Sequence, residues 1–129
     1  MTVGLKRHDR RVPHLSGDLD GVREHLDHIA GVGAGLLYLT PFFPARSTHR
    51  YDATTFDRVD PLLGGDAALA RRAVAAHERG IRVLGDITLN HCGNHHEWFE
   101  AAQDPAAPER AYFRFDPSLR HGYECWWGN

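Results

Sequence analysis

The strongest constraint on the fold is a pattern that occurs twice along the chain. Each copy has an amphipathic helix, a glycine, a short apolar strand and a polar loop, over residues 16–41 and again over 64–91. The strands are predicted at 36–39 and 81–87. Corresponding positions in the two copies have the same separation, because Gly33 and Gly80 are 47 residues apart, as are Leu39 and Asp86. Such alternation is typical of an α/β protein with a parallel sheet.

Both helices are expected to begin at an aspartate N-cap, Asp18 in the first copy and Asp66 in the second. The apolar side of the first helix is predicted to hold Leu19, Val22, Leu26 and Ile29, and that of the second Leu69, Ala73, Val74 and Ala76. Parallel strands end at one edge of their sheet, so the polar loops that follow them are expected to carry the function.

Composition places the chain among globular proteins. Its 129 residues are 42% hydrophobic and 25% charged, and the formal net charge of −2 gives no basic face for a nucleic acid. The longest apolar stretch, around residues 35–43, is too short to span a bilayer, and residues 1–18 lack the apolar run of a signal peptide. A cytoplasmic protein is therefore expected, with Cys92 and Cys125 as free thiols.

The order of the predicted helices and strands divides the chain into two regions. The loop after the first strand, residues 41–65, is long, but its aromatic residues favour an ordered, functional loop over a disordered one. After about residue 100 the helix–strand pattern stops, and residues 101–129 carry three prolines and many aromatic residues. We predict an α/β region over residues 1–99 and a loop-rich insertion over 100–129.

Chemistry-bearing residues gather where the second strand ends, in VLGDITLNHCGNHHEWF, residues 83–99. Asp86 lies within the strand, and Asn90 and His91 follow its carboxyl end. Two hypotheses fit Asp86. It is either a structural residue that makes hydrogen bonds within the strand, or part of a substrate-binding surface. Amide and imidazole groups donate to hydroxyls without the desolvation cost of a full charge, which favours a polyhydroxylated ligand over a phosphate.

The first loop offers a counterpart in Tyr51 and Asp52. A loop tyrosine is commonly a packing residue, but a tyrosine face beside a carboxylate also suits a sugar ring with its hydroxyls. Trp98, Trp126 and Trp127 fit either the sugar site or the core.

A metal site is a further reading. His91, Cys92, His95, His96 and Glu97 are all potential ligands, yet no HExxH and no paired Cys or His spacing is present. Nucleotide binding is excluded by the absence of GxGxxG and GxxxxGK[ST] patterns.

Taken in order, three segments resemble the α-amylase family, glycoside hydrolase family 13. They are GDLDGVREHLDHIAGVGAGLLYLTPFFPA, STHRYDATTFDRVDPLLGG and HERGIRVLGDITLNHCGNHHEWF. The resemblance covers about residues 15–99 and, more loosely, the WWG at 126–128. It is nearest to the neopullulanase, cyclomaltodextrinase and maltodextrin glucosidase group.

The resemblance implies a partial (β/α)₈ barrel, with residues 35–40 and 81–88 as its second and third strands. It implies that Asp86 shapes the site, that His91 hydrogen-bonds a glucose unit and that Tyr51, followed by Asp52, stacks on that glucose. Asn90 is then a structural residue or a calcium ligand. The expected partner is an α-glucan or maltooligosaccharide, with no nucleic acid, no membrane and no required cofactor besides optional calcium.

The family reaction is retaining hydrolysis of α-1,4- or α-1,6-glucosidic bonds by two carboxyl groups about 5–5.5 Å apart. By resemblance, these groups come from the fourth and fifth strands, beyond residue 129, so no catalytic residue is predicted in this chain. A complete barrel takes about 250 residues, and a fragment is therefore expected. Such a fragment should be marginally stable, oligomeric or prone to aggregate, because its sheet edges and one sheet face are open.

Two alternatives stay open. One is a non-catalytic carbohydrate-binding or interaction protein derived from the barrel. The other is an unrelated α/β protein with a metal bound at His91, His95 and His96.

Overall fold

The computed structural model describes residues 17–125, so Trp126 and Trp127 lie outside the described residues. The chain separates into two compact units, Met1–Gly93 and Asn94–Asn129. The predicted boundary between residues 99 and 100, as a division into barrel and insertion, stays a prediction. The first unit contains α1 (Leu19–Glu24), α2 (Leu26–Gly31), β1 (Leu36–Leu39), η1 (Pro61–Leu63), α3 (Gly65–His77) and β2 (Arg82–Gly85); the second contains α4 (Glu97–Ala101) and η2 (Pro108–Tyr112).

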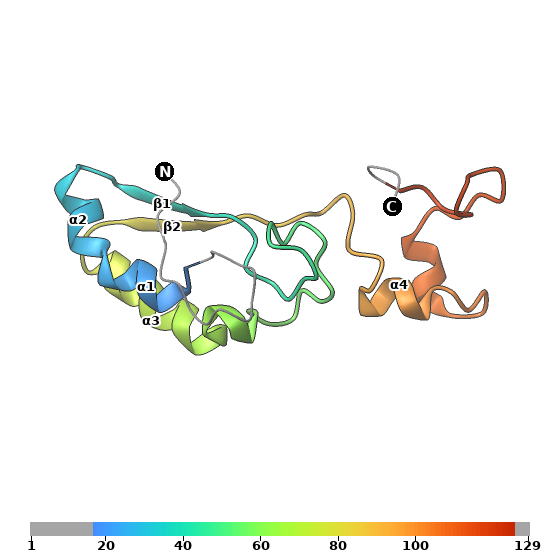
Figure 1. Cartoon of the computed structure of the whole chain (residues 1–129), viewed down its shortest axis with the longest axis horizontal. Helices are drawn as coiled ribbons and strands as arrows, with labels where there is room; N and C mark the ends of the chain where they lie inside the picture. Colours follow the sequence, from blue (N-terminus) through green and yellow to red (C-terminus); the bar gives the residue numbers. More distant parts are fainter. Residues whose placement is uncertain (1–16, 126–129) are drawn as a thin grey trace. The chain divides into compact units, whose positions relative to one another are not determined.

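The first unit is built on a two-stranded parallel sheet, as the repeated pattern predicts. The two strands pair from Leu36 opposite Arg82 to Leu39 opposite Gly85. The helices α1, α2 and α3 lie along one side of this sheet (Figure 1). The strand β1 occupies the predicted residues 36–39, whereas β2 is shorter than the predicted 81–87. The Ile81 amide donates to the Ala76 carbonyl oxygen of α3 at 2.9 Å, so its backbone completes the helix end instead of the sheet.

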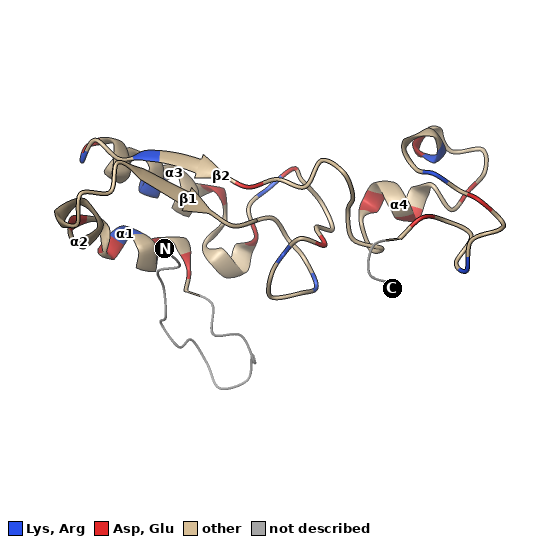
Figure 2. Cartoon of the chain, turned by 90° about the horizontal axis from the view of Figure 1, so that it is seen from above, with Lys and Arg blue, Asp and Glu red and all other residues tan. Residues whose placement is uncertain are grey.

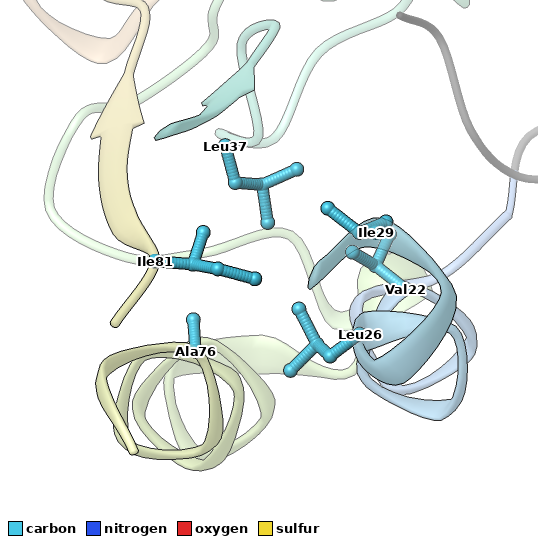
Figure 3. Close-up of a cluster of buried hydrophobic side chains, with 6 residues drawn as sticks. All are labelled: Val22, Leu26, Ile29, Leu37, Ala76 and Ile81. Atoms are coloured by element: carbon cyan, nitrogen blue, oxygen red, sulfur yellow. The ribbon is translucent and has the colours of Figure 1, made fainter. Parts of the chain in front are cut away.

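The core of the first unit lies between the helices and the helix-facing side of the sheet. It consists of the buried residues Val22, Leu26, Ile29, Leu37, Ala76 and Ile81, whose side chains point toward one another in Figure 3. Alternation along the strands places Leu36, Tyr38 and Leu84 on the opposite face, where each is about half exposed, at 47%, 51% and 49%. One face of the sheet is therefore packed and the other is open.

The first predicted helix is divided into two, which corrects the expectation of one continuous helix. Asp18 caps α1 as predicted, accepting a hydrogen bond from the Gly21 amide at 2.6 Å. At His25 the helix breaks, because the imidazole Nδ1 lies 2.8 Å from the Gly21 carbonyl oxygen and the His25 amide donates to Val22 instead. A side chain thus occupies the carbonyl that the next helical turn would use.

The start of α3 also differs from the prediction. Its N-cap is Gly64, at φ +98°, rather than Asp66. The Asp66 carboxylate lies in the first turn and accepts from the Val59 amide at 2.7 Å, so it holds the preceding loop. The buried side of α3 is Ala68, Arg72 and Ala76, whereas Val74, predicted to face the core, is 58% exposed.

The second unit is held together by aromatic side chains. Phe99 on α4 packs against Phe113, Phe115 and Tyr123, with ring centroids 4.8–6.1 Å apart. The Arg110 guanidinium lies 3.3 Å from the centroid of the Phe115 ring. Within the region predicted to be loop-rich, the described residues thus contain the 3-10 helix η2 and three aromatic side chains that pack on Phe99.

Charges of both signs are interspersed along the same elements within residues 17–125 (Figure 2). No helix among these residues is long and apolar enough to cross a membrane. Cys92 and Cys125 are both free thiols, as predicted.

Candidate functional site

The candidate site lies at the carboxyl edge of the parallel sheet. Asp86 directly follows β2, and its amide donates to the Leu39 carbonyl oxygen at 2.9 Å, which continues the strand pairing by one residue. Since side chains alternate along a strand, Asp86 shares the open face of the sheet with Leu84 and with Tyr38, the register partner of Leu84. The sheet therefore brings a carboxylate and a phenol hydroxyl together.

Tyr51 reaches the same carboxylate from the long loop after β1. Its hydroxyl donates a hydrogen bond to Oδ2 of Asp86 at 2.8 Å. Hydrogen bonds from the Tyr38 and Tyr51 hydroxyls hold the pKa of the Asp86 carboxyl below its ordinary value, against the smaller opposing effect of burial. The same bonds raise the pKa of both tyrosines. The result is an ionised carboxylate that accepts from two phenol hydroxyls.

Asp52 closes the loop that carries Tyr51. Its Oδ2 accepts from the Ser47 amide at 3.1 Å, and its Oδ1 accepts from the Ser47 hydroxyl. His49 lies between Ser47 and Asp52 in the sequence, and its Nδ1 accepts a hydrogen bond from the Tyr51 amide at 3.1 Å. The hydrogen bonds of the Asp52 side chain are therefore with its own loop, and its predicted contact with a sugar stays a prediction.

The loop after β2 is joined to the loop after β1 through Gly93. Its amide donates to the Ala53 carbonyl oxygen at 2.9 Å. His91 lies two residues before Gly93 and is half-buried, and Asn90 is exposed. Tyr51 in turn lies two residues before Ala53, so the structure brings the predicted residues of both loops to one edge of the sheet.

Metal binding has limited support in the described residues. Between residues 17 and 125, no group of three or more His, Cys, Asp and Glu side chains could hold an ion. His95 contacts Glu100 at 3.3 Å, and the buried His96 caps α4 by accepting from the Trp98 amide at 3.1 Å. Calcium binding by Asn90 stays a prediction. Cys92 is partly buried, and desolvation raises the pKa of its thiol to about 11, so it is a poor nucleophile and metal ligand at neutral pH.

Sequence reasoning missed two residues of this arrangement, Tyr38 and Gly93. Tyr38 is the one aromatic side chain in the aliphatic strand LLYL, and it lies one position before the strand end, on the face that Asp86 shares. The alternation of side chains along a strand could therefore have predicted that Tyr38 lies near Asp86. Gly93 carries no such signal, since a close approach to another loop cannot be read from its neighbours in sequence.

Comparison with known protein families gives one match over nearly the whole chain. The family model described as alpha amylase, catalytic domain, matches residues 5–126.

Among curated proteins, the chain is 40% identical over 100 residues to the alpha-amylase SusG of Bacteroides thetaiotaomicron, covering 77% of this chain and 14% of that protein. It is 44% identical over 79 residues to a cyclomaltodextrinase from a Bacillus species, covering 61% of this chain and 14% of that enzyme. The chain therefore spans about one seventh of the length of these relatives.

Solved structures of glycoside-acting enzymes also match this chain. The cyclic α-maltosyl-(1→6)-maltose hydrolase of Arthrobacter globiformis superposes with a TM-score of 0.81 at 32% identity, over 98% of this chain and 31% of that one. The debranching enzyme of Nostoc punctiforme superposes with a TM-score of 0.80 at 30% identity, over 99% and 32% of the two chains.

Proposed function

Because this chain belongs to the α-amylase catalytic-domain family, with the fold of a partial (β/α)₈ barrel, we propose that it forms one wall of the α-glucan-binding cleft of a glycoside hydrolase. The observation that carries this proposal is the hydrogen bond from Tyr51 to Asp86, which ties the loop after one strand to the end of the next. In a barrel of this kind, substrates meet the carboxyl ends of the strands.

The contacts of Tyr51, Asp86 and Asp52 support the roles proposed for them, and the role of His91 rests on its place in the adjoining loop. Tyr51 is partly exposed, with its hydroxyl held by Asp86, so the ring is fixed while part of it stays available to the apolar face of a glucose unit. Asp86 orients Tyr51 and Tyr38 and does not itself react. His91, on the adjoining loop, donates to a glucose hydroxyl. Asp52 shapes the turn that presents Tyr51, besides its proposed contact with the sugar.

The proposed reaction is retaining hydrolysis of α-1,4- or α-1,6-glucosidic bonds, which requires a carboxylate nucleophile and a carboxylic acid. We propose that later strands of the barrel supply both. The residues of this chain then bind and orient the sugar, and Asn90 is a proposed calcium ligand in the assembled site.

Binding is tested by NMR titration of the 129-residue chain with maltotriose, with cellotriose as the control sugar. We expect maltotriose to shift signals of the first unit, and Tyr51→Ala to weaken this binding by about tenfold or more. Tyr112→Ala is the matched control, because Tyr112 is 64% exposed in the other unit and should leave binding unchanged. Equal binding by Tyr51→Ala and the parent chain would contradict the proposal.

Catalysis is tested separately by incubating maltohexaose with the chain. We expect no hydrolysis by the 129 residues and hydrolysis by a protein that continues into later barrel strands, where Tyr51→Ala should reduce kcat/KM. The intact mass of the protein captured from its native cells distinguishes this function from a non-catalytic carbohydrate-binding protein.

A further inference from the structure

The residue just before Tyr51 has an unusual backbone. Among the non-glycine residues of the described chain, Arg50 alone has a positive φ, +62°. This left-handed conformation is unfavourable for a residue with a side chain and costs glycine nothing. Residues held in this way usually persist only where the surrounding structure over-determines them, and such strain gathers at functional sites.

The side chain of Arg50 supplies that constraint. Arg50 is 8% exposed, and its guanidinium pairs with the carboxylate of Asp60, a residue that is 5% exposed. The guanidinium also donates to the Phe43 carbonyl oxygen at 3.4 Å.

Asp60 is itself held by hydrogen bonds to the loop backbone. Its carboxylate accepts from the Leu62 amide at 2.8 Å, and its own amide donates to the Phe42 carbonyl oxygen at 2.9 Å. The buried pair therefore joins the start, the middle and the end of the long loop.

The backbone around Arg50 is held by short-range hydrogen bonds. The Arg50 amide donates to the Ser47 hydroxyl oxygen at 3.2 Å, and that hydroxyl donates to Asp52. The Tyr51 amide donates to Nδ1 of His49 at 3.1 Å. Tyr51 is thus fixed at its backbone by this turn and at its hydroxyl by Asp86, 35 residues further along the chain.

We propose that Arg50 is a positioning residue for sugar binding: its buried pair with Asp60 holds the left-handed backbone that directs Tyr51 onto Asp86. The part of this inference that concerns sugar rests on the proposed function. The part that concerns the loop does not, because the contacts of Arg50, Asp60, Tyr51 and Asp86 are all within the first unit.

Two substitutions separate this role from simple stabilisation of the loop. Arg50→Gly and Arg50→Ala both remove the ion pair, but only glycine adopts φ +62° without strain. If the backbone conformation matters, Arg50→Gly keeps Tyr51 on Asp86 better than Arg50→Ala does. If Arg50 only stabilises the loop, alanine does at least as well, because glycine adds flexibility to the unfolded chain.

The readout is the ¹³Cζ signal of Tyr51 in a chain labelled at its tyrosine rings, at neutral pH and without sugar. Tyr51→Phe assigns the signal, and the shift that Asp86→Asn causes in it reports the hydrogen bond. We expect Arg50→Ala to reduce this shift by half or more and Arg50→Gly to retain most of it. Should Arg50→Ala fail to fold, Arg50→Met replaces it, since it also lacks the charge and keeps the strained φ.

Two results overturn the role of Arg50. One is that Asp86→Asn shifts the Tyr51 ¹³Cζ signal as much in Arg50→Ala as in the parent chain. The other is that this shift is lost equally in Arg50→Gly and Arg50→Ala. Maltotriose is then titrated into the same variants, and we expect the loss of binding to follow the loss of the NMR response. If the parent chain shows the expected NMR order but binds no maltotriose, the proposed function is overturned and the positioning of Tyr51 by Arg50 stands.

Discussion

Gly93 and Asp52 approach so closely that no side chain fits between them. A Cβ atom added to Gly93 would lie 2.4 Å from the Asp52 carbonyl oxygen, in the place where the two loops of the candidate site are joined. The obstructing atom belongs to the backbone of the turn that carries Tyr51, so it cannot swing aside as a flexible side chain would. The spacing of the two loops therefore depends on the absence of a side chain at this glycine.

Gly93→Ala is predicted to push the two loops apart. We expect a loss of about 1–3 kcal/mol in the free energy of unfolding of the first unit, together with weaker maltotriose binding, because overpacking displaces the backbone next to Tyr51. Urea denaturation and NMR titration measure the two effects. Gly31→Ala is the control, since no atom outside its immediate surroundings lies within 4 Å of an added Cβ there, and it should be neutral or slightly stabilising.

Asp86 is predicted to contribute to stability in a pH-dependent way. Hydrogen bonds from Tyr38 and Tyr51 lower its pKa in the folded state, so its contribution is fully present above the ordinary aspartate pKa of about 3.9. The contribution is lost as pH falls through the lower, folded-state value. We expect Asp86→Asn to be less stable than the parent chain at neutral pH and to show a shallower loss of stability below about pH 4.

Urea midpoints between about pH 2 and 7 test this prediction. Tyr51→Phe should reproduce part of the change, because it removes one of the two donors. Tyr112→Phe should not, because Tyr112 is an exposed residue of the other unit. Parallel acid profiles for Asp86→Asn and the parent chain would argue against a hydrogen-bonded Asp86 in solution.

Arg72 is predicted to be a destabilising residue. It is fully buried on α3, and none of its three guanidinium nitrogens has a hydrogen-bond partner in the described structure. Desolvation lowers its pKa to about 10. Because the charged form is disfavoured by folding, the penalty is present below that pKa and is relieved as pH rises above it.

Replacing Arg72 by Leu should raise the free energy of unfolding at pH 7 by roughly 1–3 kcal/mol. Arg71→Leu is the matched control on the same helix, because Arg71 is exposed and pairs with Asp20 at 2.8 Å, so its removal should change stability by less than about 1 kcal/mol. A loss of stability in Arg72→Leu would show that Arg72 has a partner in solution.

The open face of the sheet is predicted to make the 129-residue chain self-associate. Leu36, Tyr38 and Leu84 place half-exposed apolar surface on two strands that have no further sheet neighbours in the described structure. We expect Leu84→Glu to reduce the sedimentation-average mass at micromolar concentration. Leu62→Glu should not, since Leu62 is exposed on η1 and belongs to neither strand. A sharp, cooperative melt from a monomeric parent chain would contradict this prediction.

The local structure was largely encoded in the sequence. The apolar spacing of Leu19, Val22, Leu26 and Ile29 identified the buried side of the first helical segment, and the apolar run 36–39 marked β1. Asp18 capped α1 because its side chain needs only the amide three residues on. Periodicity and capping depend on neighbours within a few residues, so the sequence predicts them well.

Other local features were outside the reach of such patterns. The break at His25 required its imidazole to contact the Gly21 carbonyl, and Asp66 turned away from the predicted cap toward Val59. Arg72 was not among the residues predicted on the apolar side of α3, yet it is fully buried there. At Asp66 and Arg72, tertiary packing rather than residue type decided where the side chain lies.

The sequence by itself was enough to name the candidate site residues. Motifs, strand ends and the family resemblance together predicted Tyr51, Asp52, Asp86, Asn90 and His91. Only the tertiary structure decided that Tyr51 donates to Asp86 and that Arg50 adopts a left-handed backbone beside it. The physical reason is that contacts between residues 35 positions apart depend on strand register and on the path of the intervening loop. Both are set by packing over the whole unit, and neither leaves a periodic signal in the chain.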